Sequence, residues 1–101
     1  MKVVFHINEN HKWAMLNSNL RNILEKDSSI VLSVVINGEA VTYFTESDYQ
    51  NNPKVKYHIC NNSLKQRGIE LHNLKDNETI VSSGVYELAL LQSLNYFYIK
   101  P

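Results

Sequence analysis

The stretch KYHICNNSLKQRGI, residues 56 to 69, contains Cys60, the one cysteine of this 101-residue chain. An apolar run precedes Cys60, and a polar, helix-like segment follows it. A thiol between a strand and a helix N-terminus meets unpaired backbone N–H groups, which stabilise the thiolate. Nucleophilic attack and persulfide formation both require that thiolate. Cys60 is therefore the first candidate for chemistry, and the alternative is a packed core residue, because cysteine is often buried.

The residues beside Cys60 favour the chemical interpretation. Asn61, Asn62 and Ser63 are good helix-capping residues, and no apolar residue follows until Leu64. We predict that these three residues stabilise a thiolate or line its pocket. A core-filling cysteine has less reason to stand in such a polar context.

His58 comes two residues before Cys60, so both side chains point to the same face of a strand, about 6–7 Å apart along the chain. A histidine there could raise the local positive potential. The alternative is a surface or edge histidine with no role. Ser83 and Gly84 form a further candidate pair, because Gly84 would allow a small anion or a partner to approach the backbone closely. Their alternative role is helix capping.

Other chemistries find little support in the sequence. His6, His11 and His72 show no metal-ligand spacing with one another or with Cys60, so we expect no metal and no cofactor. The three glycines are far apart, which excludes the fingerprints of dinucleotide and phosphate-binding loops. No pair of carboxylates is placed as in a hydrolase.

The elements that must position Cys60 follow from the alternation of apolar runs with helical patterns. Parallel neighbouring strands need crossovers, so this order predicts an α/β sheet with helices on both faces. Working residues of such sheets gather at the carboxyl edge, where Cys60 is expected. Strands are predicted at residues 3–7, 30–36, 55–60, 79–83 and 97–100, helices at about 11–26, 63–67 and 84–96, a helical turn at 40–44 and a polar surface excursion at 45–54.

Length and composition limit the remaining possibilities. With 44% apolar and 20% charged residues, residues 1–101 are expected to form a single domain. Ten basic residues balance ten acidic ones, so neither nucleic acid nor a membrane surface is an expected partner. No apolar run has the length of a membrane span or signal core, and a lone cysteine suits the reducing cytosol. Six tyrosines, three of them near the C-terminus, suggest contact between subunits.

Four blocks of the sequence, in order, resemble the small DsrE/DsrF-like proteins: VVFHINE, VVINGEAV, YHICNNSLKQRGI and VSSGVYELALLQSLNYFYIKP. The resemblance implies a three-layer α/β/α fold with a five-stranded, mainly parallel sheet, DsrEFH-like and flavodoxin-like in its layering. It also implies a homo-oligomer, a trimer or hexamer. In family members tied to sulfur oxidation or tRNA thiolation, a cysteine at the place of Cys60 accepts sulfur as a persulfide and passes it on. One departure is that the segment between Phe44 and Val55 is shorter and more polar than the helix of such proteins.

The leading hypothesis is a cytosolic sulfur-relay protein that carries sulfane sulfur on Cys60. Because the chain has one cysteine, the second thiol must come from a sulfur donor or acceptor protein. Such a chain is a persulfide carrier rather than a conventional multi-turnover enzyme. The alternative is a non-catalytic oligomeric module that binds a small ligand or a protein, with Cys60 packed inside.

Overall fold

The computed structural model describes all 101 residues as one sheet with helices around it. Five strands alternate with three α-helices and two 3-10 segments, and the order matches the alternation expected from the sequence. The elements are β1 (Lys2–Ile7), η1 (Asn10–Lys12), α1 (Trp13–Lys26), β2 (Val31–Ile36), η2 (Gly38–Thr45), β3 (Val55–Cys60), α2 (Asn61–Gln66), β4 (Glu78–Val81), α3 (Gly84–Ser93) and β5 (Phe97–Ile99).

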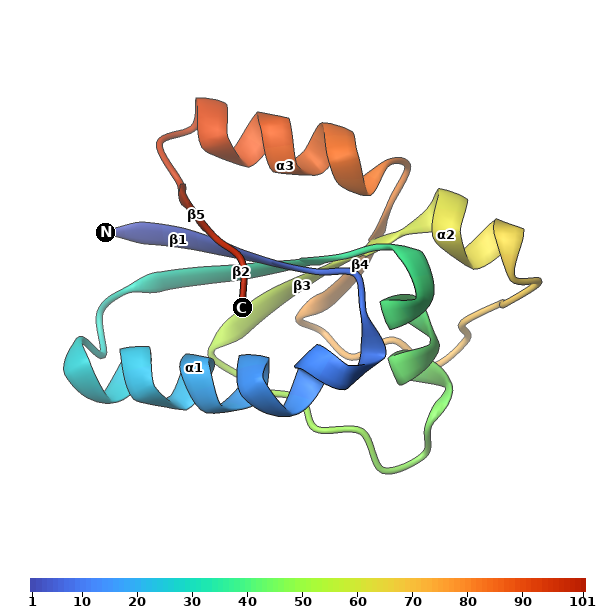
Figure 1. Ribbon diagram of the computed structural model, residues 1–101, viewed down its shortest axis with the longest axis horizontal. Coiled ribbons are helices and arrows are strands. Elements are labelled where there is room, and N and C mark those ends of the chain that lie inside the picture. The colour runs from blue at the N-terminus through green and yellow to red at the C-terminus, as the bar shows by residue number, and fades with distance from the viewer.

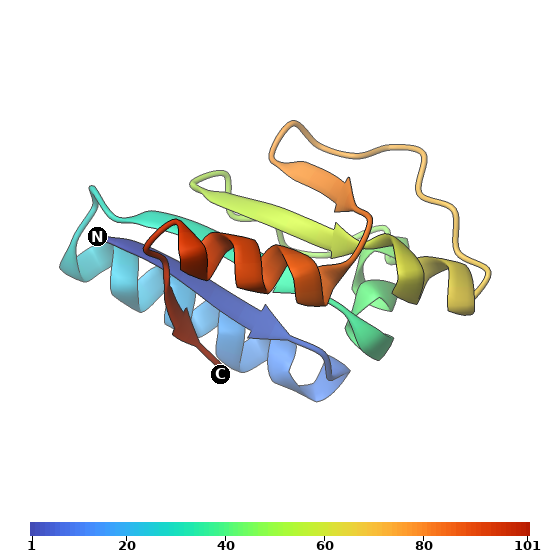
Figure 2. The same cartoon turned by 90° about the horizontal axis from the view of Figure 1, so that it is seen from above.

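All five strands are parallel, in the order β4-β3-β2-β1-β5 (Figures 1 and 2). The three central strands are rich in β-branched residues and almost entirely buried, as expected where both faces of a sheet are covered. Their carboxyl ends point to the edge where α2 and η2 lie (Figure 2). The predicted α/β/α class is confirmed, and the mainly parallel sheet is fully parallel.

The two faces of the sheet carry cores of different size. In Figure 1, α1 and η2 lie below the sheet and α3 lies above it. The lower face holds a cluster of 17 buried apolar residues, among them Leu16 and Leu20 of α1. The upper face holds only four, which are Val4, Val35, Leu88 and Leu91. Polar side chains therefore occupy part of the space beneath α3.

The helices differ from the sequence prediction at their first residues. The predicted start of the first helix, His11, lies in η1, and regular α-helix begins at Trp13. Helix α2 begins at Asn61, directly after β3, instead of at Ser63. Consequently Cys60 is the N-cap residue of α2, and the polar residues predicted as caps form its first turn.

The C-terminal elements are shorter than predicted. Strand β4 covers Glu78–Val81 instead of residues 79–83, and β5 ends at Ile99. Helix α3 ends at Ser93 because Asn95 takes a left-handed conformation, with φ of 70°. Asparagine tolerates this conformation and commonly stops a helix there. No α-helix of the chain combines the length and the apolar character that crossing a membrane requires.

Candidate functional site

Cys60 lies at the junction between β3 and α2, at the carboxyl edge of the sheet. Its backbone is extended, with φ of −70° and ψ of 116°, while the next residue is already helical. The chain thus turns from strand to helix without a loop, and the side chain of Cys60 stands at the helix N-terminus. Only 5% of the residue is exposed, so the thiol is recessed.

The surroundings of the thiol stabilise its charged form. Burial alone would raise the pKa of Cys60, but four hydrogen-bond donors outweigh it and lower the pKa below its ordinary value. The donors are the hydroxyl and N–H of Ser63, the N–H of Gly84 and the N–H of Asn62.

Ser63 links the thiol to the loop after β2. Its Oγ accepts a hydrogen bond of 2.8 Å from the N–H of Gly38, which leaves the hydroxyl proton available to the sulfur. Gly38 has φ of +58°, and a Cβ there would lie 3.1 Å from the carbonyl oxygen of Asn8. Glycine is therefore needed where the ends of β1 and β2 meet α2.

Gly84 brings a second helix N-terminus to the same sulfur. A Cβ at this position would lie 3.2 Å from Cβ and 3.6 Å from Sγ of Cys60, and 3.2 Å from Cβ of Asn37. The sequence suggested that an anion or a partner approaches the backbone at Gly84. In the structure, Cys60 itself occupies that position. Ser83 is the N-cap of α3, and its side chain accepts the N–H of Tyr86 at 3.2 Å. Ser83 acts here as a helix cap.

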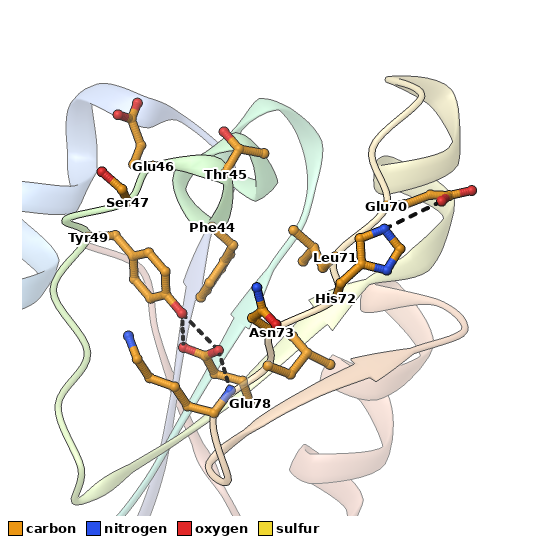
Figure 3. Close-up of a pocket in the computed structure, with 12 residues that line it drawn as sticks. Phe44, Thr45, Glu46, Ser47, Tyr49, Glu70, Leu71, His72, Asn73 and Glu78 are labelled. Carbon is orange, nitrogen blue, oxygen red and sulfur yellow. Dashed lines mark hydrogen bonds and ion pairs between the residues drawn. The ribbon is translucent and has the colours of Figure 1, made fainter.

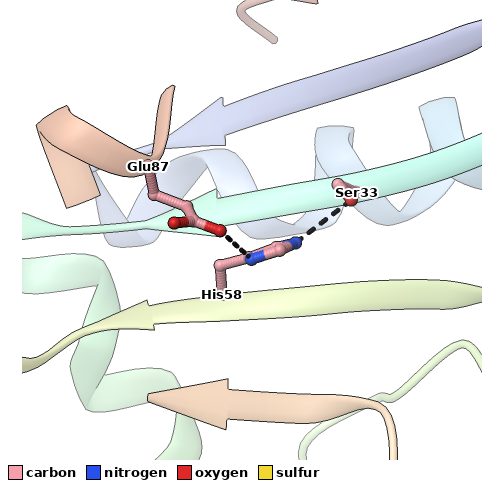
Figure 4. Close-up of polar contacts among 3 residues, drawn as sticks. All are labelled: Ser33, His58 and Glu87. Carbon is pink, nitrogen blue, oxygen red and sulfur yellow. Dashed lines mark hydrogen bonds and ion pairs between the residues drawn. The ribbon is translucent and has the colours of Figure 1, made fainter. Parts of the chain in front are cut away.

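His58 is not a surface or edge histidine, since only 4% of the residue is exposed. It lies between Ser33 and Glu87, with Nε2 3.1 Å from Ser33 Oγ and Nδ1 2.9 Å from Glu87 Oε2 (Figure 4). Burial lowers the pKa of His58 more than Glu87 raises it. The lowered pKa favours a neutral imidazole near pH 7, which argues against the suggestion that His58 adds positive potential.

A second histidine, His6, belongs to the same edge of the sheet, which sequence reasoning missed. Its Nε2 lies 2.9 Å from Oδ1 of Asn37, and its Nδ1 lies 2.8 Å from the hydroxyl of Tyr98. With Nε2 protonated, His6 donates to Asn37 and accepts from Tyr98. Because Asn37 also borders Gly84, this chain of contacts reaches from β5 to the surroundings of Cys60. The sequence feature that could have indicated this contact is the position of Asn37 directly after a strand, at the carboxyl edge of the sheet.

Four hollows of the surface lie away from the thiol, and Cys60 lines none of them. One of about 500 Å³ lies between η2 with the loop after it and the loop before β4 (Figure 3). At its base the buried Glu78 accepts hydrogen bonds from the hydroxyl of Tyr49, Nδ2 of Asn51 and the N–H of Lys75. These bonds fasten the polar excursion to β4.

No group of three histidine, cysteine or acidic side chains is placed to hold a metal ion. What the edge provides instead is a recessed sulfur faced by the first turns of two helices. Such an arrangement can stabilise a thiolate or another small anion bonded to it. It has no general acid or base within the contacts described.

The fold is that of DsrE-like proteins, and two solved structures support this assignment. The protein of unknown function MTH1491 from Methanobacterium thermoautotrophicum has a TM-score of 0.84 and 28% identity, over 99% of this chain and 98% of its own. The ychN protein from E. coli has a TM-score of 0.66 and 18% identity, over 99% of this chain and 97% of its own. No family profile matches the sequence, and no curated protein matches it.

Proposed function

We propose that the protein is a sulfur-relay carrier that holds sulfane sulfur as a persulfide on Cys60. The thiolate attacks the outer sulfur of a donor persulfide, R–S–SH. The new bond joins Cys60 Sγ to that sulfur as the donor S–S bond breaks, and the donor leaves as the thiolate R–S⁻. The product is Cys60–S–SH, and attack on its outer sulfur by an acceptor thiolate regenerates the Cys60 thiolate. No net oxidation occurs.

The observation that carries the proposal is the convergence of two helix N-termini on one sulfur. Donors from the first turn of α2 and from Gly84 of α3 lower the pKa of Cys60 against the opposing effect of burial. A cysteine that only filled a gap would need no such donors, and burial would leave it protonated. We place the carrier in the cytosol, where a lone thiol stays reduced.

The carrier is further proposed to be a homo-oligomer whose subunits meet through a surface on α3 and β5. Residues 84–99 contain one charged residue, Glu87, and its side chain is largely buried. Strand β5 pairs only with β1, so its outer edge is open. An exposed surface that is apolar and uncharged can pack against the same surface of a second subunit without burying a charge. We call it the α3–β5 surface, and its exposed members are Val85, Tyr86, Leu90 and Leu94 of α3 with Tyr98 of β5, which faces the same side of the sheet as Val4.

The test of sulfur carriage is the intact mass of the protein after incubation with a low-molecular-weight persulfide. We expect a gain of one sulfur atom that a reductant removes and that Cys60→Ser abolishes. Ser63→Ala is a graded variant, because it removes one donor to the sulfur but keeps the thiol, and it should load more slowly. If the wild-type protein gains no sulfur at any donor concentration, the proposal is wrong.

The second candidate function, a binding module with Cys60 packed inside, is favoured by the 5% exposure of Cys60. The two candidates differ in how Cys60 reacts with a small alkylating reagent. A carrier thiol reacts in the native protein. A packed thiol reacts only after unfolding, or no faster than its global unfolding rate allows.

A further inference from the structure

The side chains of Ser33, His58 and Glu87 form a buried polar group beneath α3 (Figure 4). The order serine, histidine, carboxylate resembles a hydrolase triad. Ser33, however, is only 2% exposed and lies within a central strand, so no substrate can reach it as a nucleophile. The three side chains are therefore more important for joining β2, β3 and α3 than for attacking a substrate.

The hydrogen bonds define the state of the imidazole. A carboxylate can only accept, so Nδ1 of His58 carries the proton that is donated to Glu87 over 2.9 Å. With the ring neutral, Nε2 then accepts from the hydroxyl of Ser33 over 3.1 Å. Every partner in this arrangement has the correct polarity, so β2, β3 and α3 are joined by one chain of hydrogen bonds.

Two contacts between β3 and α3 run side by side. Along β3, His58 and Cys60 are two residues apart and share a face. Along α3, Glu87 and Gly84 are three residues apart and share a face. Glu87 meets His58, and one turn earlier Gly84 meets Cys60, because α3 runs back over the sheet against the direction of β3.

Apolar packing does not fix the first turn of α3. The buried apolar residues of the helix, Leu88 and Leu91, pack on Val4 of β1 and Val35 of β2. In the first turn Val85 and Tyr86 are 69% and 65% exposed. The hydrogen bond that Nδ1 of His58 donates to Glu87 is therefore the polar contact that holds this turn against β3.

We infer that His58 is a positioning residue for Cys60: through Glu87 it holds the first turn of α3 so that the N–H of Gly84 faces the sulfur. The inference rests on the proposed thiolate of Cys60 but not on the identity of the sulfur donor. His58 has no contact of its own with the sulfur among the hydrogen bonds of the structure. Its effect on the thiol is exerted through the helix.

Two amide substitutions separate the two bonds of the imidazole. In His58→Asn the amide N–H replaces Nδ1 and can still reach Glu87, while the contact with Ser33 is lost. In His58→Gln the longer amide replaces Nε2 and can still reach Ser33, while the bond to Glu87 is lost. A second pair is milder for folding: Glu87→Gln keeps an acceptor for His58, and Glu87→Ala keeps the helix but removes the acceptor.

The measurement is the pH profile of Cys60 alkylation in each native variant, with thermal unfolding measured in parallel. We expect His58→Gln and Glu87→Ala to raise the midpoint and to slow alkylation at neutral pH by about tenfold, as for the loss of one hydrogen bond to a charged group. His58→Asn and Glu87→Gln should keep the wild-type midpoint. A purely structural role would lower the unfolding temperature without moving the midpoint.

The outcomes distinguish this inference from the proposed function. A low wild-type midpoint that none of the four variants shifts overturns the inference and leaves the Cys60 proposal standing. A shift of equal size in all four variants also overturns it, because the bond to Glu87 would then not be what matters. A wild-type midpoint at the ordinary thiol value overturns both.

Discussion

At the scale of single residues, the site depends on how closely the backbone of α3 approaches Cys60. The absence of a side chain at Gly84 permits this approach, because a Cβ would lie 3.2 Å from Cβ of Cys60 and of Asn37. Cys60 is buried and Asn37 is held by His6, so neither neighbour can move away at low cost. A methyl group at Gly84 should therefore act directly on the thiol.

Gly84→Ala is expected to destabilise the protein by about 1–2 kcal/mol through overpacking, and to slow alkylation of Cys60 because the N–H of residue 84 moves away from the sulfur. Chemical denaturation and alkylation rates measure the two effects. Gly68→Ala is the control: φ there is +64° and nothing lies within 4 Å of the added Cβ. It should cost about 1–2 kcal/mol in backbone strain and leave the thiol unchanged, whereas equal slowing in both variants would contradict the account.

Local order along the chain was enough to predict where Cys60 lies but not all that surrounds it. A strand, a cysteine and a polar helix start are consecutive in sequence, so the helix N-terminus beside the thiol could be foreseen. The burial of His58 could not, because its partners Ser33 and Glu87 are 25 and 29 residues away and belong to other elements. Ser33 was the available signal, as the one polar residue within an apolar strand.

At the scale of elements, periodicity predicted all five strands and three helices but missed most of their ends. The ends depend on capping and on backbone conformation at single residues, such as the left-handed Asn95 that stops α3. The helical pattern alone also did not separate the buried from the exposed apolar residues of α3. Leu90 and Leu94 widen its apolar stripe in the sequence, yet they are 38% and 50% exposed.

The proposed subunit contact can be tested by a substitution on the exposed side of α3. Leu90→Glu introduces a charge at an exposed position and keeps a good helix former, so the fold should survive. We expect the wild-type protein to scatter light as an oligomer and Leu90→Glu to shift it toward the 11.7 kDa monomer. Met15→Glu is the matched control on α1, where Met15 is 51% exposed, and it should not change the mass. A monomeric wild-type protein would rule out the oligomer.

At the scale of the whole molecule, the half-buried His6 and the buried His58 couple stability to pH. Burial lowers the pKa of both His6 and His58 from 6.5 in the folded protein. Around His58 the charged groups are Glu87 of α3 and Lys56 of β3, of which Glu87 raises the pKa and Lys56 lowers it. Below about pH 6.5 the unfolded chain therefore binds more protons than the folded one, and stability falls as the pH falls.

The free energy of unfolding should thus decrease between pH 7 and about pH 5, and His6→Gln or His58→Gln should each flatten that decrease. In alkali the sign is opposite, because burial raises the pKa of Tyr57 to about 12 and the unfolded chain loses that proton first. Denaturant unfolding across the pH range measures the loss of stability in acid and in alkali. If the free energy of unfolding decreases equally steeply in acid for the wild type and both variants, the assignment to these histidines is wrong.

The central claim is that the fold lowers the pKa of Cys60 and so favours its thiolate, and the most direct test is the pH dependence of its alkylation in the native wild-type protein. The rate itself depends on access to a recessed sulfur, whereas the midpoint of the profile reports the pKa of the thiol alone. We expect a midpoint below the ordinary thiol value of about 8.5. A midpoint at or above that value, or a thiol that reacts only in the unfolded protein, would contradict it.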